Sequence, residues 1–176
     1  MKPARAAAKI RHATGADNVL LAELGARTFY DSFAADNSPE NMAAYLASSF
    51  KPDKQASELA DPYSCFLIAE IDGLAVGYAK LQPSTPPAGV HGPNPVELVR
   101  IYAEKEWIGR GIGGKLMQAC IEEARRRGYQ TIWLAVWERN TAAQAFYRKW
   151  GFAEVGTYTF LLGYDALTGI AMQRRC

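Results

Sequence analysis

The chain has 176 residues, of which 49% are hydrophobic, which suffices for one globular domain with a substantial core. Its 20 basic and 18 acidic residues leave a net charge of only +2, and this excludes the concentrated basic face that nucleic-acid binding requires. Three cysteines and two histidines show no metal-ligand spacing and no apolar run could cross a membrane, so we expect a cytoplasmic protein without a disulfide framework, metal or membrane partner.

The first third of the chain predicts one strand and three helices. We expect residues 1–8 to be mobile and residues 9–176 to form a single domain that begins with a strand at 9–13. Thr14 and Asp17 have the spacing of a capping box, and apolar residues then recur at helical intervals as far as Phe33. Ser38-Pro39-Glu40 is typical of a second helix start, and a third helix is expected at 53–60.

The remaining two thirds predict a mixed sheet. Apolar runs at 64–71 and 74–81 flank Asp72-Gly73, a strong hairpin signal, and a proline-rich loop follows at 82–95. Further elements are expected in the order strand 96–103, helix after the glycines, strand 130–136, helix 141–149, and strands 153–161 and 168–173. The strand–loop–helix–strand unit at 96–136 requires a right-handed crossover between parallel strands.

The helix after the glycines is predicted to bury one face. Its apolar positions recur at four-residue intervals, and we expect Glu122, Glu123 and the arginines at 125–127 on the solvated face. The buried positions are Ile112, Leu116, Cys120 and Ala124. Cys120 therefore reads as a core residue rather than as the nucleophile of an acyl-enzyme mechanism.

The run GRGIGG at 109–114 is the most informative motif. Glycines at the start of a helix let backbone N–H groups approach an anion, and the helix terminus adds about half a positive charge. The spacing also fits a dinucleotide fingerprint, but residues 104–108 separate it from the strand, and the Ser or Thr of a Walker loop is missing after Lys115. A glycine-rich turn without a ligand is the remaining alternative.

The chain resembles the GCN5-related N-acetyltransferase (GNAT) superfamily in four runs, KIRHATGAD, IYAEKEWIGRGIGGKLMQACIEEARRRGY, TIWLAVW and NTAAQAFYRKWGF. The resemblance implies an α+β fold with a central, mostly antiparallel mixed sheet flanked by helices. It also implies that the strand and the glycine loop bind acetyl-CoA and that a later Asn and Tyr face the thioester. The implied cofactor-binding residues are Ile101, Tyr102, Ala103, Ile108, Gly109, Arg110, Gly111, Ile112, Gly113, Gly114 and Asn140. Ile108 departs from the usual Arg or Gln of the family.

Longer runs are similar to bacterial spermidine/spermine N-acetyltransferases of the Pai type. These runs are ARTFYDSFAADNSPENMAAYLASSF, ELVRIYAEKEWIGRGIGGKL, IWLAVWERNTAAQAFYRKWGF and FLLGYDALTGIAM. That likeness implies acetylation of a primary amine of a polyamine, a small-molecule partner.

Acetyl transfer from a thioester to an amine requires a proton donor, a stabilised carbonyl oxygen and a base. Tyr147 is the candidate acid, because the reference pKa of a phenol, near 10, is close to that of an alkyl thiol; packing beside Phe146 and Phe152 is its alternative role. Asn140 would also cap the helix that carries Tyr147. Backbone N–H groups of Ile101 and Ala103 would polarise the acetyl carbonyl where the strand splays.

The base and the acceptor site are less constrained by the sequence. Strand alternation places Glu97, Val99 and Ile101 on one face, and Glu97 is the candidate base, with a surface role as the alternative. Tyr30, Asp31 and Trp137 are candidate substrate contacts, because a polyamine needs carboxylates and aromatic faces.

These observations predict a metal-free N-acetyltransferase that acts by direct attack in a ternary complex, and a homodimer remains possible. Three rivals stay open. One is a protein or peptide N-terminal acetyltransferase on the same fold, another is an acyl-CoA-binding regulatory module without turnover, and a more distant third is an aminoglycoside-modifying enzyme.

Overall fold

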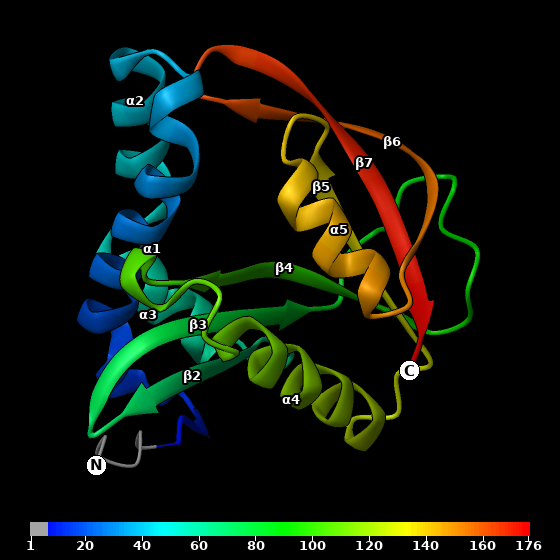
Figure 1. Cartoon of the computed structure of the whole chain (residues 1–176), viewed down its shortest axis with the longest axis horizontal. Helices are drawn as coiled ribbons and strands as arrows, with labels where there is room; N and C mark the ends of the chain where they lie inside the picture. Colours follow the sequence, from blue (N-terminus) through cyan, green and yellow to red (C-terminus); the bar gives the residue numbers. More distant parts are fainter. Residues whose placement is uncertain (1–6) are drawn as a thin grey trace.

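One seven-stranded sheet organises the molecule, and the computed structural model describes residues 7–176 of it. The strand order is β1-β2-β3-β4-β5-β7-β6 (Figure 1). All neighbouring strands are antiparallel except β4 and β5, which confirms the predicted mixed, mostly antiparallel sheet. The strands are β1 (Lys9–His12), β2 (Cys65–Ile71), β3 (Leu74–Gln82), β4 (Pro95–Ala103), β5 (Thr131–Trp137), β6 (Ala153–Leu162) and β7 (Asp165–Arg175).

Within residues 7–176, five α-helices cover the two faces of this sheet. Helices α1 (Asn18–Phe33), α2 (Pro39–Ser49) and α3 (Pro52–Ala60) contribute to the clusters on one face, and α4 (Ile112–Arg126) and α5 (Thr141–Lys149) pack on the other. Of the predicted mobile start at 1–8, residues 1–6 lie outside the described residues. None of the helices described in 7–176 combines the length and apolar character needed to cross a membrane.

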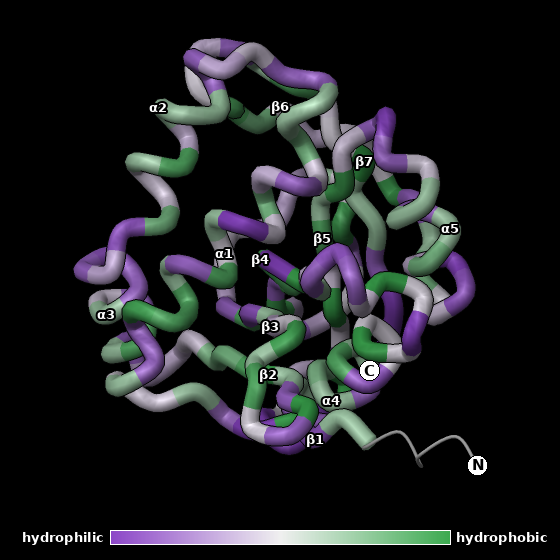
Figure 2. Tube along the Cα trace, turned by 60° about the vertical axis from the view of Figure 1, so that its left-hand side comes forward, coloured by the Kyte–Doolittle hydropathy of each residue, from purple (hydrophilic) through white to green (hydrophobic). Residues whose placement is uncertain are grey.

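The core is divided by the sheet. The larger cluster joins α4 to the strands and includes Leu116, Cys120, Ile132 and Leu134, all at most 1% exposed. The opposite face carries two smaller clusters, an aromatic one that spans α1, α2, β5 and β6 and another that lies between α1, β2 and β3. Hydrophobic segments accordingly follow the central strands in Figure 2, where β5 is strongly hydrophobic.

Local sequence signals are confirmed where they were strongest. Asp72 and Gly73 both have positive φ, 51° and 79°, as the two-residue turn between β2 and β3 requires. The backbone N–H of Thr14 donates to Asp17 Oδ2 at 2.8 Å, and Ser38 Oγ accepts from Asn41 N at 3.2 Å at the start of α2. The first contact caps the 3-10 turn at Gly15–Asp17, which leads directly into α1, and the second caps α2.

One prediction for α4 is wrong. Glu123 is only 5% exposed and does not lie on the solvated face. Its carboxylate accepts from Arg126 and Arg127, at 2.6 Å in each case, and lies 3.1 Å from His12 Nε2. Burial alone would raise the pKa of Glu123, but the hydrogen bonds from Arg126, Arg127 and His12 outweigh it and lower the pKa to about 2. Helical spacing brings Arg126 and Arg127 next to Glu123, whereas the contact with His12 depends on the fold, because His12 comes from β1.

Candidate active site

The parallel strands β4 and β5 separate after a short contact. They pair only at Pro95–Glu97 and Thr131–Trp133, although β4 continues to Ala103 and β5 to Trp137. On its other edge, β4 pairs with β3, and Glu104 N donates to Val76 O at 2.8 Å. Because hydrogen-bonded and non-bonded pairs alternate, the N–H groups of Ile101 and Ala103 point away from β3 into the splay. The predicted splay is therefore present, and it presents two backbone donors.

A β-bulge at Val99 changes the faces of β4. Lys80 lies opposite Arg100 and Leu81 opposite Leu98, so Val99 has no partner on β3. As a result, Leu98 and Ile101 both belong to the α4-side cluster, whereas Arg100 reaches the opposite face. The prediction that Glu97, Val99 and Ile101 share one face is wrong, because strict alternation fails at the bulge.

The glycine loop has the backbone geometry of an anion cradle. Gly109 and Gly111 have φ of 76° and 84°, and Gly111 is the N-cap of α4. The first N–H groups of a helix have no intrahelical acceptor, so this end of α4 offers a row of donors. Ile108 is 68% exposed, and Arg110 stacks over Trp107 at 5.2 Å. A pyrophosphate fits this donor set.

Gly77 of β3 allows the cradle to lie close to the sheet. A Cβ atom there would approach the Tyr102 carbonyl oxygen to 2.7 Å and Ile112 Cγ2 to 2.9 Å. A side chain would therefore push the first turn of α4 away from β4. Gly77 gives no signal in the sequence, because the two groups that exclude a side chain there, Tyr102 and Ile112, come from distant segments.

Helix α5 brings Tyr147 next to the cradle. Asn140 Oδ1 accepts from Ala143 N at 3.1 Å, so its capping role is confirmed, while its role towards a ligand stays a prediction. A Cβ at Gly113 would lie 3.4 Å from Phe146, which places α5 beside the first turn of α4. Tyr147 packs on the same cluster as Ile101 and Ala103.

Tyr147 has the environment of a protonated phenol. Its ring meets Phe146 and Phe152 edge-on, with centroid distances of 5.5 and 5.8 Å. No hydrogen bond to its hydroxyl is formed within residues 7–176. Burial, with a smaller contribution from Cys120, raises the pKa of Tyr147 above its usual value. The phenol therefore keeps its proton at neutral pH.

Glu97 pairs with Trp133 of β5, and this is the last residue pair before β4 and β5 separate. Ser84 Oγ, from the loop between β3 and β4, donates a hydrogen bond to Glu97 Oε2. Burial raises the pKa of Glu97, whereas Ser84 and the charges of Lys80 and Arg100 lower it. A carboxylate with a raised pKa at this position suits a general base.

The three predicted acceptor contacts have different environments. Tyr30 is 53% exposed and Asp31 is also exposed, both on α1. Trp137 is only 7% exposed and lies in the aromatic cluster, with its ring 5.7 Å from Phe33 and the Arg139 guanidinium 5.8 Å above it. The structure thus brings Trp137 to the wide end of the splay, and substrate contact by all three residues stays a prediction.

A buried charge cluster lies on the face of the sheet opposite α4. Glu58 of α3 pairs with Lys80 at 2.9 Å and with Arg100 at 3.2 Å. Lys80 is 3% exposed, and Arg100 lies over the Phe50 ring at 5.1 Å. This cluster ties α3 to the strands that hold Glu97.

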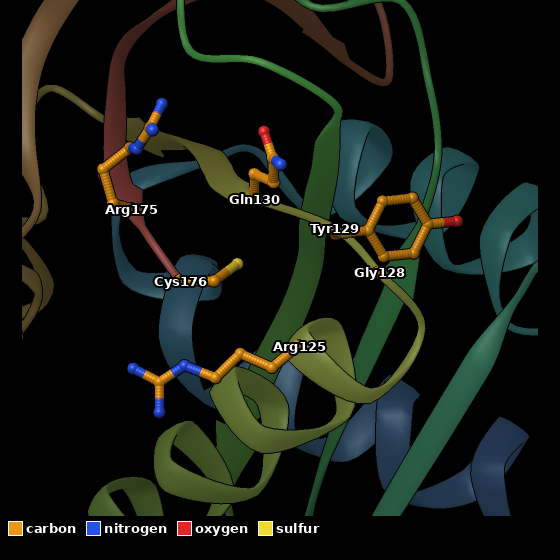
Figure 3. A pocket seen from close by; sticks show the side chains of 6 residues that line it. All are labelled: Arg125, Gly128, Tyr129, Gln130, Arg175 and Cys176. Atoms are coloured by element: carbon orange, nitrogen blue, oxygen red, sulfur yellow. The ribbon is translucent and has the colours of Figure 1, made fainter.

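Two other features lie away from the splay. His12, Cys65 and Glu123 place potential metal ligands within 4.8 Å of one another, but two guanidinium groups already occupy the Glu123 carboxylate and burial raises the pKa of Cys65 to about 11. A surface hollow of about 460 Å³ lies at the far end of α4 (Figure 3). It is lined by Arg125, Gly128, Tyr129, Gln130, Arg175 and Cys176, none of which is a predicted site residue.

Comparison with known proteins agrees with this geometry. The model of the acetyltransferase (GNAT) family matches residues 26–152. An uncharacterized N-acetyltransferase of Lactobacillus delbrueckii subsp. lactis is 36% identical over 147 residues, which cover 84% of this chain and 85% of that protein.

Solved structures share the whole architecture. The PaiA N-acetyltransferase of Thermoplasma acidophilum, solved in complex with coenzyme A, has a TM-score of 0.79 and 20% identity, with 97% of this chain and 99% of that chain covered. The ribosomal-protein-alanine N-acetyltransferase of Brucella melitensis has a TM-score of 0.72 and 29% identity, with 96% and 99% covered.

Proposed function

This chain belongs to the acetyltransferase (GNAT) family and is an acetyl-CoA-dependent acyltransferase, and we propose that its acceptor is a primary amine of a polyamine such as spermidine or spermine. The proposal includes a cytoplasmic reaction in which the amine attacks acetyl-CoA directly in a ternary complex.

The charge of the elements around the acceptor face carries this proposal. Residues 18–50, which form α1 and α2, contain four acidic residues and one basic residue. Residues 153–168, which comprise β6 and the first four residues of β7, contain two acidic residues and no basic one, although Glu154 among them pairs with Arg148. These two segments together carry a formal charge of −5 in a chain whose net charge is +2. Acidic walls attract a polycation and raise its local concentration.

The chain's own residues supply the steps around the transferred group, which acetyl-CoA brings in activated form. The backbone N–H groups of the glycine loop hold the pyrophosphate, and those of Ile101 and Ala103 donate to the acetyl oxygen as negative charge develops. Glu97 takes the proton of the attacking amine, directly or through water, and Tyr147 donates its proton to the departing sulfur. Partial burial raises the pKa of both groups. This shift makes Glu97 a better proton acceptor and keeps Tyr147 protonated, but it also moves the phenol above the thiol pKa that its sequence-based assignment assumes.

A panel of amines tests the proposal. We expect coenzyme A release with spermidine and spermine, and mass spectrometry should find one added acetyl group on the polyamine. The KM for spermidine should rise with salt, because screening weakens the attraction of the acidic walls. Coenzyme A binding without thiol release on any amine would instead indicate a regulatory module.

A second candidate acceptor is the α-amine of a protein or peptide. The Brucella neighbour, whose name specifies a ribosomal protein alanine, has a higher identity to this chain than the PaiA neighbour, 29% against 20%. Faster acetylation of an alanine-initiated peptide than of spermidine in the same panel would favour this candidate.

A further inference from the structure

The loop between β3 and β4, residues 83–94, is attached to a distant part of the sheet. A Cβ atom at Gly89 would lie 2.0 Å from the carbonyl oxygen of Val155, so the loop backbone touches β6 directly. Val155 is the extra residue of a bulge in β6 and has no partner on β7. Next along the loop, His91 N donates to Gln173 Oε1 of β7 at 3.1 Å. These contacts anchor the middle of the loop on β6 and β7.

Prolines stiffen the part of the loop that leads to this anchor. The run Pro83-Ser84-Thr85-Pro86-Pro87 contains three residues of fixed φ, and a residue that precedes a proline avoids the helical region. Pro87 O accepts from Val90 N at 3.0 Å, which closes a turn that contains Gly89. The segment between the end of β3 and Gly89 therefore has few alternative conformations.

This stiff segment places Ser84 on the carboxylate of Glu97. Gln82, the last residue of β3, pairs with Glu97 on β4, and Ser84 follows two residues later. Ser84 Oγ donates to Glu97 Oε2, which leaves Oε1 without a hydrogen bond among residues 7–176. On its other edge, Glu97 pairs with Trp133 of β5, which carries no charge. One carboxylate oxygen is thus held by the loop, and the other is available to a proton.

The charges that act on Glu97 come from two strands. Burial raises the pKa of Glu97, whereas the hydrogen bond from Ser84 and the charges of Lys80 and Arg100 lower it. Glu58 of α3 pairs with both of these cations, which fixes their positions. Ser84 is exposed and belongs to no ion pair, so its hydroxyl can be removed without disturbing a buried charge.

We propose that Ser84 is a positioning residue for acetyl transfer and that the anchored loop holds its hydroxyl against Glu97. The hydrogen bond orients the carboxylate and favours its ionised form, so that Oε1 accepts the proton of the attacking amine, directly or through water. The nitrogen then attacks the acetyl carbon with the electron pair that the proton has left. This inference rests on the proposed amine acetylation with Glu97 as its base.

The pH dependence of kcat/KM tests the role of Ser84, because a merely structural role would not move it. Coenzyme A release should be measured with spermidine, or with whichever amine of the panel reacts fastest. Ser84→Ala removes the donor, and Ser84→Thr keeps a hydroxyl. Thr85→Ala is the matched control, because Thr85 carries the neighbouring hydroxyl and is also exposed. Gly89→Ala displaces the loop from β6 and leaves Ser84 itself unchanged.

In Ser84→Ala, the acidic limb should move to higher pH, because loss of the hydrogen bond raises the pKa of Glu97 and protonates the base earlier as the pH falls. On that limb, kcat/KM relative to the plateau should fall about three- to tenfold, less than for a buried bond to a charged group, because Ser84 is exposed. Ser84→Thr and Thr85→Ala should keep the wild-type limb. Gly89→Ala should move the limb in the same direction as Ser84→Ala, but it should add no further movement when Ser84 is already Ala.

The two proposals fail differently in this experiment. An unchanged limb in Ser84→Ala would overturn the positioning role while the wild type still acetylates its amine, and so would an equal movement in Thr85→Ala. Movement caused by Gly89→Ala that persists in the Ser84→Ala background would overturn the role of the anchored loop. A wild type inactive on every amine would instead overturn the proposed function.

Discussion

The substitution Tyr147→Phe removes a single oxygen atom, so it tests the catalytic role of Tyr147 with little effect on protein stability. The substitution keeps the ring that packs against Phe146 and Phe152. It removes only a hydroxyl that has no hydrogen-bond partner within the described chain, so no net hydrogen-bond energy is lost. We therefore expect the free energy of unfolding to change by less than about 0.5 kcal/mol.

The effect on turnover should be far larger. A positioned general acid contributes roughly 10²- to 10⁴-fold to the rate. At about 1.36 kcal/mol for each factor of ten, this corresponds to roughly 2.7 to 5.5 kcal/mol of transition-state stabilisation. The KM for acetyl-CoA should change little, because the cradle at Gly109–Gly114 binds through backbone groups rather than through the phenol.

The pH dependence follows from the direction of the shift. Burial raises the pKa of Tyr147 above its ordinary value near 10, so the acid form persists across the neutral and mildly alkaline range. Rates of the wild type should therefore not fall through loss of this proton between about pH 7 and 9.

Steady-state release of coenzyme A with spermidine, measured beside thermal unfolding, provides the assay. Tyr129→Phe is the matched control, because Tyr129 lines the hollow at the far end of α4 (Figure 3). Turnover of Tyr147→Phe within about twofold of the wild type would refute the assignment, as would an equal loss in the control.

Three further predictions follow from other residues. Glu97→Gln should lower kcat about 10²- to 10³-fold and abolish the acidic limb of the pH–rate profile. In the wild type, this limb should lie above the ordinary carboxyl pKa, because burial raises the pKa of Glu97. An unchanged limb in the variant would show that another group is the base. Gly111→Ala should lower the free energy of unfolding by about 1–2 kcal/mol, because Gly111 has a positive φ. Calorimetry should also show weaker acetyl-CoA binding by this variant. Gly114→Ala should fold normally, because the nearest atom to its new Cβ would be 3.6 Å away. Glu123 has a pKa lowered from 4.5 to about 2, so its stabilisation is complete above about pH 4.5 and is lost as the pH falls towards 2; the unfolding free energy of Glu123→Gln should vary less over that window.

Most elements were predictable because their signals are local. Helical spacing, the capping pattern at Thr14 and the Asp72-Gly73 turn each depend on residues within a few positions, and the observed helices and hairpin follow them. Strand β7 was predicted to begin at Thr168 but begins at Asp165. The three extra residues lie near the turn of the hairpin with β6, where no buried face imposes apolar alternation.

Parts of the candidate site were also predictable where their signals are local. The glycine cradle is continuous with helix α4, and Tyr147 lies in a helix whose N-cap, Asn140, is close to it in sequence. The bulge at Val99, the bond from Ser84 to Glu97 and the bond from Asn41 to Asp165 depend on register or on partners far along the chain. Periodicity carries no information about such pairings, because a one-residue shift moves a side chain to the other face of a sheet.

The bulge at Val99 would allow one strand to serve two substrates. Beyond it, Ile101 keeps its side chain in the α4-side core while its N–H points into the splay, and Arg100 anchors the other face through Glu58. Strict alternation would have placed Leu98 and Arg100 on the same face, which would bury a guanidinium group in the larger cluster at a cost of several kcal/mol. The extra residue therefore lets β4 present apolar side chains to the donor side and Glu97 with Arg100 to the acceptor side, and the acetyl group would cross between these two environments.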